Sequence, residues 1–200
     1  EAHATLLLKR GEAEAARAAI DLVLDEKIPD DERRRLLLRR AEAWVAAGRA
    51  DAAFPDARAA LDGRIPTPDD LRAAEVALAA DQPEAAERWA RGVAELERAD
   101  DATRARALEL RLRALDAADA PDDRAPILRA LLARAAPGSA QASRLRARLR
   151  ATLEASARHA QLHALEREAA GLPGLTPSDR AQRWLAAAEV AHRRLDDAAA

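Results

Sequence analysis

Two histidines, His159 and His163, are four residues apart, a spacing that places both imidazoles on one face of a helix and could bring them to a metal ion. The residues between them are Ala, Gln and Leu, so the glutamate of the zinc hydrolase motif is missing. Glu166, within two helical turns, is the only nearby candidate for a further ligand, and a third ligand is not evident. The chain has no cysteine, which excludes a zinc–thiolate site. We therefore interpret both histidines as ordinary helix residues and expect no metal and no cofactor.

Paired carboxylates are a second group that could do chemistry, as general acid and base. They occur at three places in the chain, Asp30-Asp31, Asp100-Asp101 and Asp122-Asp123. Each pair precedes or opens a predicted helix, where carboxylates satisfy free backbone N–H groups and complement the helix dipole. Helix capping therefore accounts for these acids, and the chain has no glycine-rich phosphate loop of recognisable spacing. We predict that the protein is not an enzyme.

A third candidate is an arginine series at alternate positions, Arg144, Arg146, Arg148 and Arg150. On a helix this spacing spreads the guanidinium groups around the axis, and no aromatic residue lies between them to stack on bases. The whole chain has a formal charge of only −2 at pH 7, although 34% of its residues are charged. Interspersed charges of both signs are typical of solvated helix surfaces, so we expect no nucleic-acid partner.

The elements that hold these residues are predicted to be helices throughout. Of the 200 residues, 49% are hydrophobic but only 2% are aromatic, and the abundant Ala, Leu, Arg and Glu favour helix over strand. Thr67-Pro68 and Thr176-Pro177 each combine an N-cap hydroxyl with a proline at the first helical position. No apolar stretch is long enough to cross a bilayer, so we expect no membrane insertion.

Part of the sequence repeats at a fixed interval. Four residues recur 37 positions later, namely Gly11 as Gly48, Ala16 as Ala53, Leu24 as Leu61 and Pro29 as Pro66. A period of this length is typical of stacked helical hairpins, because a single hairpin cannot bury its apolar face alone. The interval shortens to 33 between Ala53 and Ala86, so we expect irregular units.

Helix start and stop residues, together with the spacing of the apolar residues, predict paired helices. The pairs are residues 1–9 with 12–26, 31–47 with 51–61, 68–80 with 83–98, and 102–118 with 122–135. Residues 139–170 contain no glycine or proline, and form either a hairpin that turns near Ser156 or one long helix. A last helix is expected at residues 177–195. The following Asp196-Asp197-Ala198 is typical of another helix start, so we interpret the chain as a fragment of a longer array.

The second repeat resembles a tetratricopeptide repeat (TPR). The pattern of that family has a small residue, an aromatic residue, a glycine at the turn, two small packing residues, an Ala-Leu pair and a closing proline. These places are taken here by Ala41, Trp44, Gly48, Ala53, Ala57, Ala60-Leu61 and Pro66. The resemblance is specific in roughly the first half of the chain and in the last helix, and loose from residue 102 to residue 170. It implies that Trp44 and the alanines lie at the seams between hairpins.

The fold implied by this resemblance is all-α, a right-handed α-solenoid of about five to six antiparallel helical hairpins. It would form a single domain over residues 1–200, with approximate units at 1–29, 30–66, 67–100, 101–137, 138–175 and an incomplete 176–200. The first helices of the pairs would line a concave groove. The peptide-binding face of that groove is predicted to comprise Leu38, Glu42, Val45, Leu71, Glu75, Leu78, Leu185, Glu189 and His192.

The three glutamates of this face would form an acidic ladder flanked by aliphatic side chains. Such a ladder suits a protein or peptide partner that carries Lys or Arg between apolar residues. The alternative is local pairing along each helix, of Glu42 with Arg39, of Glu75 with Arg72, and of Glu189 with Arg193.

The predicted function is therefore a scaffold that binds a protein or peptide without catalysis. The alternative is a rigid spacer or assembly segment in a larger bacterial protein, such as a signalling kinase or an envelope export component. A chain without cysteine suits the cytoplasm and the periplasm alike, and the cytoplasm is the favoured location.

Overall fold

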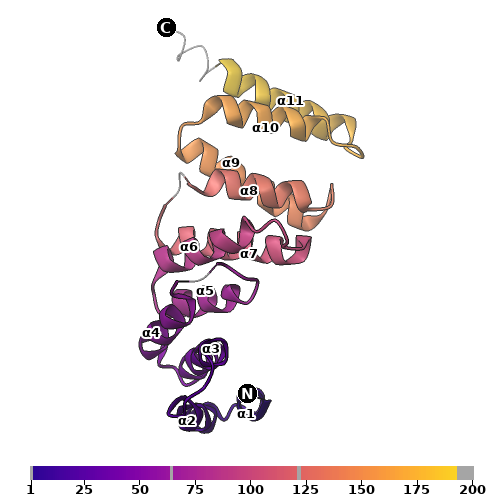
Figure 1. Ribbon diagram of the computed structural model, residues 1–200. Helices are drawn as coiled ribbons and strands as arrows, with labels where there is room; N and C mark the ends of the chain where they lie inside the picture. Colours follow the sequence, from indigo (N-terminus) through magenta and orange to yellow (C-terminus); the bar gives the residue numbers. More distant parts are fainter. Residues whose placement is uncertain (1, 64, 121–122, 193–200) are drawn as a thin grey trace. The chain divides into compact units, whose positions relative to one another are not determined.

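The computed structural model describes residues 2–63, 65–120 and 123–192, and these ranges contain helices and turns but no strand (Figure 1). The all-α prediction is confirmed. The helices of the described residues are α1 (Ala2–Lys9), α2 (Ala13–Leu24), α3 (Asp30–Ala46), α4 (Ala50–Leu61), α5 (Asp70–Ala79), α6 (Pro83–Ala94), α7 (Asp101–Ala117), α8 (Arg124–Arg134), α9 (Ala140–Ala155), α10 (His159–Ala170) and α11 (Pro177–Val190).

The helix bounds agree closely with those expected from the sequence. Two helices end earlier than expected, α6 at Ala94 where the prediction extended to residue 98, and α11 at Val190 where it extended to residue 195. Residues 193–195 of that last prediction lie outside the described residues. Residues 139–170 form two helices joined by a turn at Ser156, which decides against a single long helix. The helix start expected at Asp196 lies outside the described residues.

The expected capping residues are present at two helix starts. The hydroxyl of Thr176 accepts the N–H of Asp179 at 3.1 Å, with proline at the first position of α11. Asp100 caps α7 by accepting the N–H of Thr103 at 2.7 Å, and this hydrogen bond lowers the pKa of Asp100. Capping thus explains the acid pair at residues 100–101, while Asp122 of the third pair lies outside the described residues.

The chain divides into two compact units, residues 1–118 and 119–200, which we describe separately. The helices of the fourth predicted pair are divided between them, with α7 in the first unit and α8 in the second. A single domain over residues 1–200, the right-handed twist and the antiparallel hairpins of a solenoid remain predictions.

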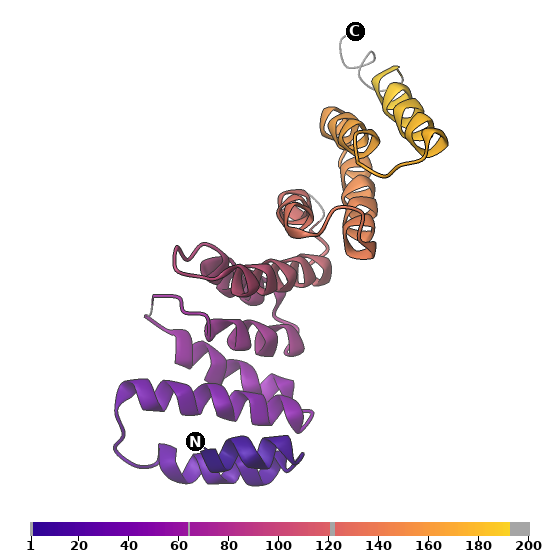
Figure 2. The same cartoon turned by 90° about the vertical axis from the view of Figure 1, so that its right-hand side faces the viewer.

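In the first unit the helices pack in chain order, each against the next (Figure 2). The odd-numbered helices also contact one another, α1 with α3, α3 with α5, and α5 with α7. Among the described residues, no such contact joins α2 to α4 or α4 to α6. The odd-numbered helices therefore form a continuous layer, which we call the odd-helix layer.

Small side chains allow this close packing. The core between α3, α4 and α5 contains Ala41, Ala53, Ala57 and Ala73, none of which exposes any surface. Alanine at contact positions lets helix axes approach to the short end of the usual separation of about 8–10 Å. The aromatic ring of Trp44 lies at the edge of this core and is only partly buried.

The turn that follows each odd-numbered helix from α1 to α9 contains one residue with positive φ, although the sequences differ. The residue with positive φ is Gly11, Gly48, Asp81, Asp119 or Ala157, at intervals of 37, 33, 38 and 38. After Gly11, Gly48, Asp81 and Ala157, the N–H of the next residue donates to the carbonyl five positions back at 2.8–2.9 Å. This is the Schellman pattern, which satisfies free carbonyls at the helix end. The left-handed turn thus recurs where the sequence resemblance is loose.

A charged network joins α2, α3 and α4. Arg40 of α3 donates two hydrogen bonds to Asp56 of α4, both at 2.7 Å, and a third to Asp21 of α2 at 2.8 Å. Arg17 donates to the other carboxylate oxygen of Asp21 at 2.5 Å. Asp56 is only 8% exposed, and its hydrogen bond raises the pKa of Arg40 although burial opposes this. A bidentate arginine thus holds three successive helices together.

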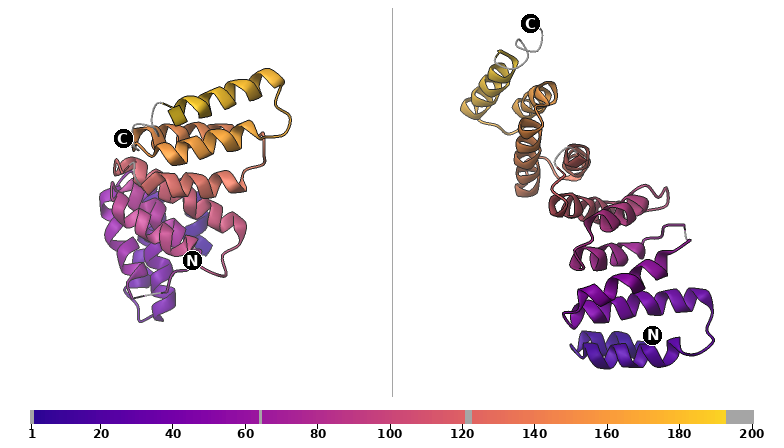
Figure 3. Two further views of the ribbon diagram at one scale, coloured as in Figure 1. Left: turned by 90° about the horizontal axis from the view of Figure 1, so that it is seen from above. Right: turned by 90° about the vertical axis from the view of Figure 1, so that its left-hand side faces the viewer.

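The second unit packs α8 against α9, α9 against α10, and α10 against α11. Its core contains four leucines that are almost fully buried, Leu128, Leu149, Leu153 and Leu165. In Figure 3, right panel, α9 is seen from the side where α8 is seen nearly end-on, so these two neighbours cross. His163 of α10 fixes α11 through a contact of 2.9 Å between its Nδ1 and the Ala187 carbonyl oxygen.

Glycine and alanine at the recurring turn should have opposite effects on stability. Ala157→Gly should raise the free energy of unfolding by about 0.5–1 kcal/mol, because glycine adopts positive φ without strain. Gly48→Ala should lower it by about 1 kcal/mol through the backbone alone, since a Cβ there would meet no atom within 4 Å. Urea denaturation measures both changes. Ala155→Gly, in the helix before the turn, is the control and should be destabilising; an equal loss from Ala157→Gly would refute the left-handed turn.

Removal of the Arg40 guanidinium should destabilise the first unit. Arg40→Met leaves the buried carboxylate of Asp56 without its arginine, while Asp21 keeps Arg17, and should lower the free energy of unfolding by about 2–3 kcal/mol. Arg58→Met, at an exposed position of α4, is the matched control and should change it by less than about 0.5 kcal/mol. Chemical denaturation of both variants tests the network, and equal effects would contradict it.

Candidate functional site

Six of the predicted site residues lie on α3 and α5, which are neighbours in the odd-helix layer. Leu38 and Leu71 are core residues, 6% and 2% exposed, so they offer a partner little surface. The other four are partly buried at the surface of the layer, namely Glu42, Val45, Glu75 and Leu78. We call these four residues the α3–α5 face.

The remaining three predicted residues belong to the second unit. Leu185 and Glu189 are exposed on α11, and Leu185 is 63% exposed. His192 lies two residues beyond the end of that helix and is also exposed. The two units are described separately, so these residues are not joined to the α3–α5 face. The expected pairing of Glu189 with Arg193 involves a residue outside the described ranges.

Both glutamates of the α3–α5 face are bound by arginines of the next odd-numbered helix. Glu42 accepts a hydrogen bond from the Arg72 Nε of α5, and a second from Arg39 of its own helix at 3.0 Å. Glu75 accepts a hydrogen bond from Arg106 of α7 at 2.6 Å. The local pair of Glu42 with Arg39 is therefore present, together with ion pairs between helices.

These interhelical ion pairs change the electrostatics of the face. The side chains of Glu42 and Arg72 are each 24% exposed, while those of Glu75 and Arg106 are 41% and 55% exposed. A ligand therefore meets carboxylates and guanidinium groups in alternation. A basic side chain would have to share each carboxylate with an arginine, and an acidic side chain could bind the arginine.

Neither Arg106 nor the interhelical role of Arg72 was predicted from the sequence. Each arginine follows its glutamate by 30 or 31 positions, which is close to one repeat. That spacing is a signal that the sequence contains. It becomes informative only when consecutive odd-numbered helices are known to be in contact.

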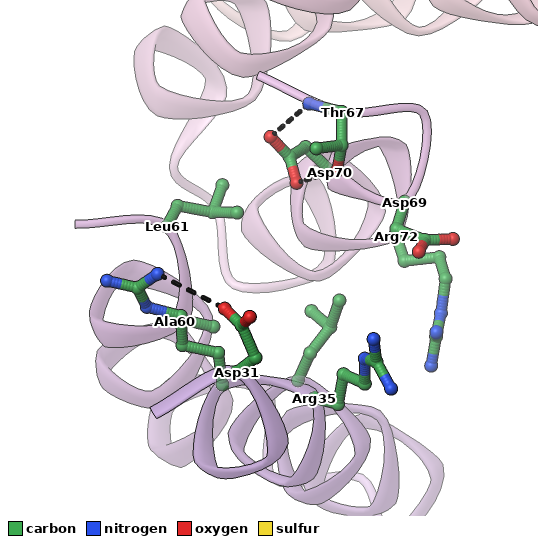
Figure 4. A pocket seen from close by; sticks show the side chains of 10 residues that line it. Asp31, Arg35, Ala60, Leu61, Thr67, Asp69, Asp70 and Arg72 are labelled. Atoms are coloured by element: carbon green, nitrogen blue, oxygen red, sulfur yellow. Dashed lines mark hydrogen bonds and ion pairs between the residues drawn. The ribbon is translucent and has the colours of Figure 1, made fainter. Parts of the chain in front are cut away.

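A pocket of about 270 Å³ adjoins the face, between α3, the end of α4 and the start of α5 (Figure 4). Leu38 and Arg72 belong to its lining, and Asp31, Arg35 and Asp69 supply further charges. A pocket with charges of both signs can hold one polar side chain of a ligand in either charge state.

The start of α5, which forms one wall of this pocket, does not have the N-cap that was expected. Thr67 was expected to accept a backbone N–H through its hydroxyl. Instead its own N–H and hydroxyl both donate to the carboxylate of Asp70, each at 2.9 Å (Figure 4). Asp70 is 5% exposed, and its carboxylate is bound by Thr67, so it is not free for a ligand.

Other kinds of site have little support in the described residues. No group of three or more His, Asp and Glu side chains in them is placed to hold a metal ion. The His163 imidazole is engaged by the α11 backbone, which gives it a structural role. None of the described helices is long and apolar enough to cross a membrane.

Comparison of the chain with models of known families, with curated proteins and with solved structures found no match. The TPR resemblance is therefore carried by the residues and turns described above. The function has to be argued from the α3–α5 face and its surroundings.

Proposed function

We propose that the chain is a TPR-like α-solenoid that binds a protein or peptide segment along the odd-helix layer. The observation that carries the proposal is the contact of α1 with α3, α3 with α5 and α5 with α7. In such a layer, equivalent surface positions recur along one direction. An extended segment can follow these positions and repeat its contacts from helix to helix.

The α3–α5 face provides the chemistry for this binding. Val45 and Leu78 offer partly exposed aliphatic surface, and the Glu42–Arg72 and Glu75–Arg106 pairs lie beside them. A Lys or Arg of the partner would bind to the carboxylates and compete with the protein's own arginines. This competition favours a partner whose basic residues are separated by the distance between successive odd-numbered helices.

Binding without catalysis is part of the proposal. The titratable groups of the face are carboxylates and guanidinium groups joined in ion pairs, which orient a ligand through charge and hydrogen bonds. The buried acid beside the face, Asp70, is bound twice by Thr67. The arrangement therefore supports recognition of a partner surface. These carboxylates are held in ion pairs and hydrogen bonds, and so are not placed to act as a general base.

A rigid spacer or assembly segment is the second candidate. The observation that favours it is the Arg40 network, because a guanidinium bonded to both Asp21 and Asp56 ties α2, α3 and α4 into one rigid group. A spacer needs this rigidity but no selective face. The two candidates therefore differ in whether charge reversal on the odd-helix layer changes binding.

Peptides selected from a random display library against the full chain should test the proposal. The double variant Glu75→Arg/Arg106→Glu retains an ion pair between α5 and α7 but exchanges the charges that a ligand meets. We expect selected basic peptides to bind this variant about tenfold more weakly in fluorescence anisotropy. Arg58→Glu, on the even-numbered α4, is the control and should bind as the wild type does. Selection of no peptide, or equal affinity for all three proteins, would favour the spacer.

A further inference from the structure

The two units carry opposite net charges, although the whole chain is nearly neutral. Residues 1–118 contain 20 Lys and Arg against 25 Asp and Glu, a net charge of −5, whereas residues 119–200 contain 13 against 10, a net charge of +3. Charge complementarity selects partners of opposite sign. The second unit is therefore suited to a partner unlike the one proposed for the first.

Two pockets in the second unit share one arginine. The first, of about 200 Å³ between α9, α10 and α11, is lined by Arg146, Arg150, Glu166 and Arg183, with Ser143 and Ala147. The second, of about 270 Å³ between α8, α9 and α10, is lined by Arg129, Leu132, Ala133, Arg146, Leu149, Leu165, Glu168 and Leu172. Arg146 lines both, and we call the two adjoining pockets together the Arg146 groove.

The cations of this groove outnumber the acids that compensate them. Glu166, 5% exposed, is paired with Arg150 at 3.4 Å, and Arg150 also binds Glu154 at 2.9 Å. Arg146 and Arg183 form no hydrogen bond or ion pair with the described residues. Burial lowers the pKa of Arg146 and the charge of Arg183 lowers it further, against the opposing effect of Glu168 and Glu166. Two guanidinium groups thus repel each other beside a pocket.

We propose that the Arg146 groove binds an acidic segment of a partner protein, with a side-chain carboxylate between Arg146 and Arg183. A carboxylate there would relieve the repulsion and could form the short, charge-assisted hydrogen bonds that guanidinium groups favour. An aliphatic neighbour of that acid would lie against Leu132 and Leu172, which are partly exposed in the adjoining pocket. This site is separate from the α3–α5 face and does not depend on it.

The surroundings favour a peptide over a nucleic acid. No aromatic side chain lines either pocket, so bases would find nothing to stack on. Glu166 and Glu168 in the walls would repel a polyphosphate backbone. A peptide that alternates acids and aliphatic residues matches the charged and apolar halves of the groove.

Fluorescence anisotropy with a labelled peptide of alternating Leu and Glu tests this site on the full chain. The peptide carries a C-terminal amide, so that its Glu side chains are its only carboxylates apart from the label. Wild-type protein should bind it, and Arg146→Gln/Arg183→Gln should weaken binding at least about tenfold. Arg144→Gln, an exposed position of α9 outside both pockets, is the matched control and should change the affinity less than about twofold. The Glu75→Arg/Arg106→Glu variant of the first unit should bind the peptide as the wild type does.

Four binding results would overturn the proposal. They are an equal loss in Arg144→Gln, undiminished binding by the double variant, a loss in the first-unit variant, and tighter binding of a single-stranded oligouridylate than of the peptide. Because neither arginine is paired with a described residue, the double variant should also melt at or above the wild-type temperature. A clear fall in melting temperature would show that these arginines stabilise the fold, which would contradict a ligand site.

Discussion

The reversal of the chain after each odd-numbered helix depends on one residue in the left-handed conformation. At Gly48, for example, φ is +75°, and the next N–H donates to the carbonyl of Trp44. This bond pattern ends the helix and sets the direction in which the next one starts. In the first unit the turn recurs after α1, α3 and α5, and these helices and α7 contact one another in succession. The proposed binding face lies along these contacts.

Charged side chains then distinguish the two sides of the first unit. Arg40 bonds carboxylates of α2 and α4, and so fixes the even-numbered helices to α3. Glu42 and Glu75 bind arginines of the next odd-numbered helix across the exposed side of the layer. Partly exposed pairs of this kind contribute little net stability, on the order of 1 kcal/mol or less. Their arginines and carboxylates can therefore exchange partners with a ligand at small cost.

The helices were predictable from sequence because their signals are local. Alanine-rich periodicity and capping residues such as Thr176 act within one or two turns of the chain. The repeated turn was recognised at Gly48 but not at Asp81 or Ala157. Glycine indicates a positive φ in a sequence, whereas aspartate and alanine do not. Their left-handed conformation is imposed by the packing of the helices on either side, which sequence spacing does not reveal.

The candidate sites were only partly predictable, because they depend on contacts between helices. Placing Glu42 and Glu75 on one face needed only the repeat period, and both lie at the surface of the layer. Their partner Arg106, and the burial of Leu71, needed the packing of α5 against its neighbours. The Arg146 groove was missed because alternate arginines spread around α9, and only the positions of α10 and α11 show which of them meet.

The central claim is that the odd-numbered helices form a continuous layer, and methyl NOE spectroscopy in solution tests it most directly. Leu38 of α3 and Val76 of α5 belong to one buried cluster with Ala41 and Ala73. The account predicts cross-peaks between methyl groups of α3 and α5, and none between α2 and α4. Cross-peaks that join α2 to α4, with none between α3 and α5, would contradict it.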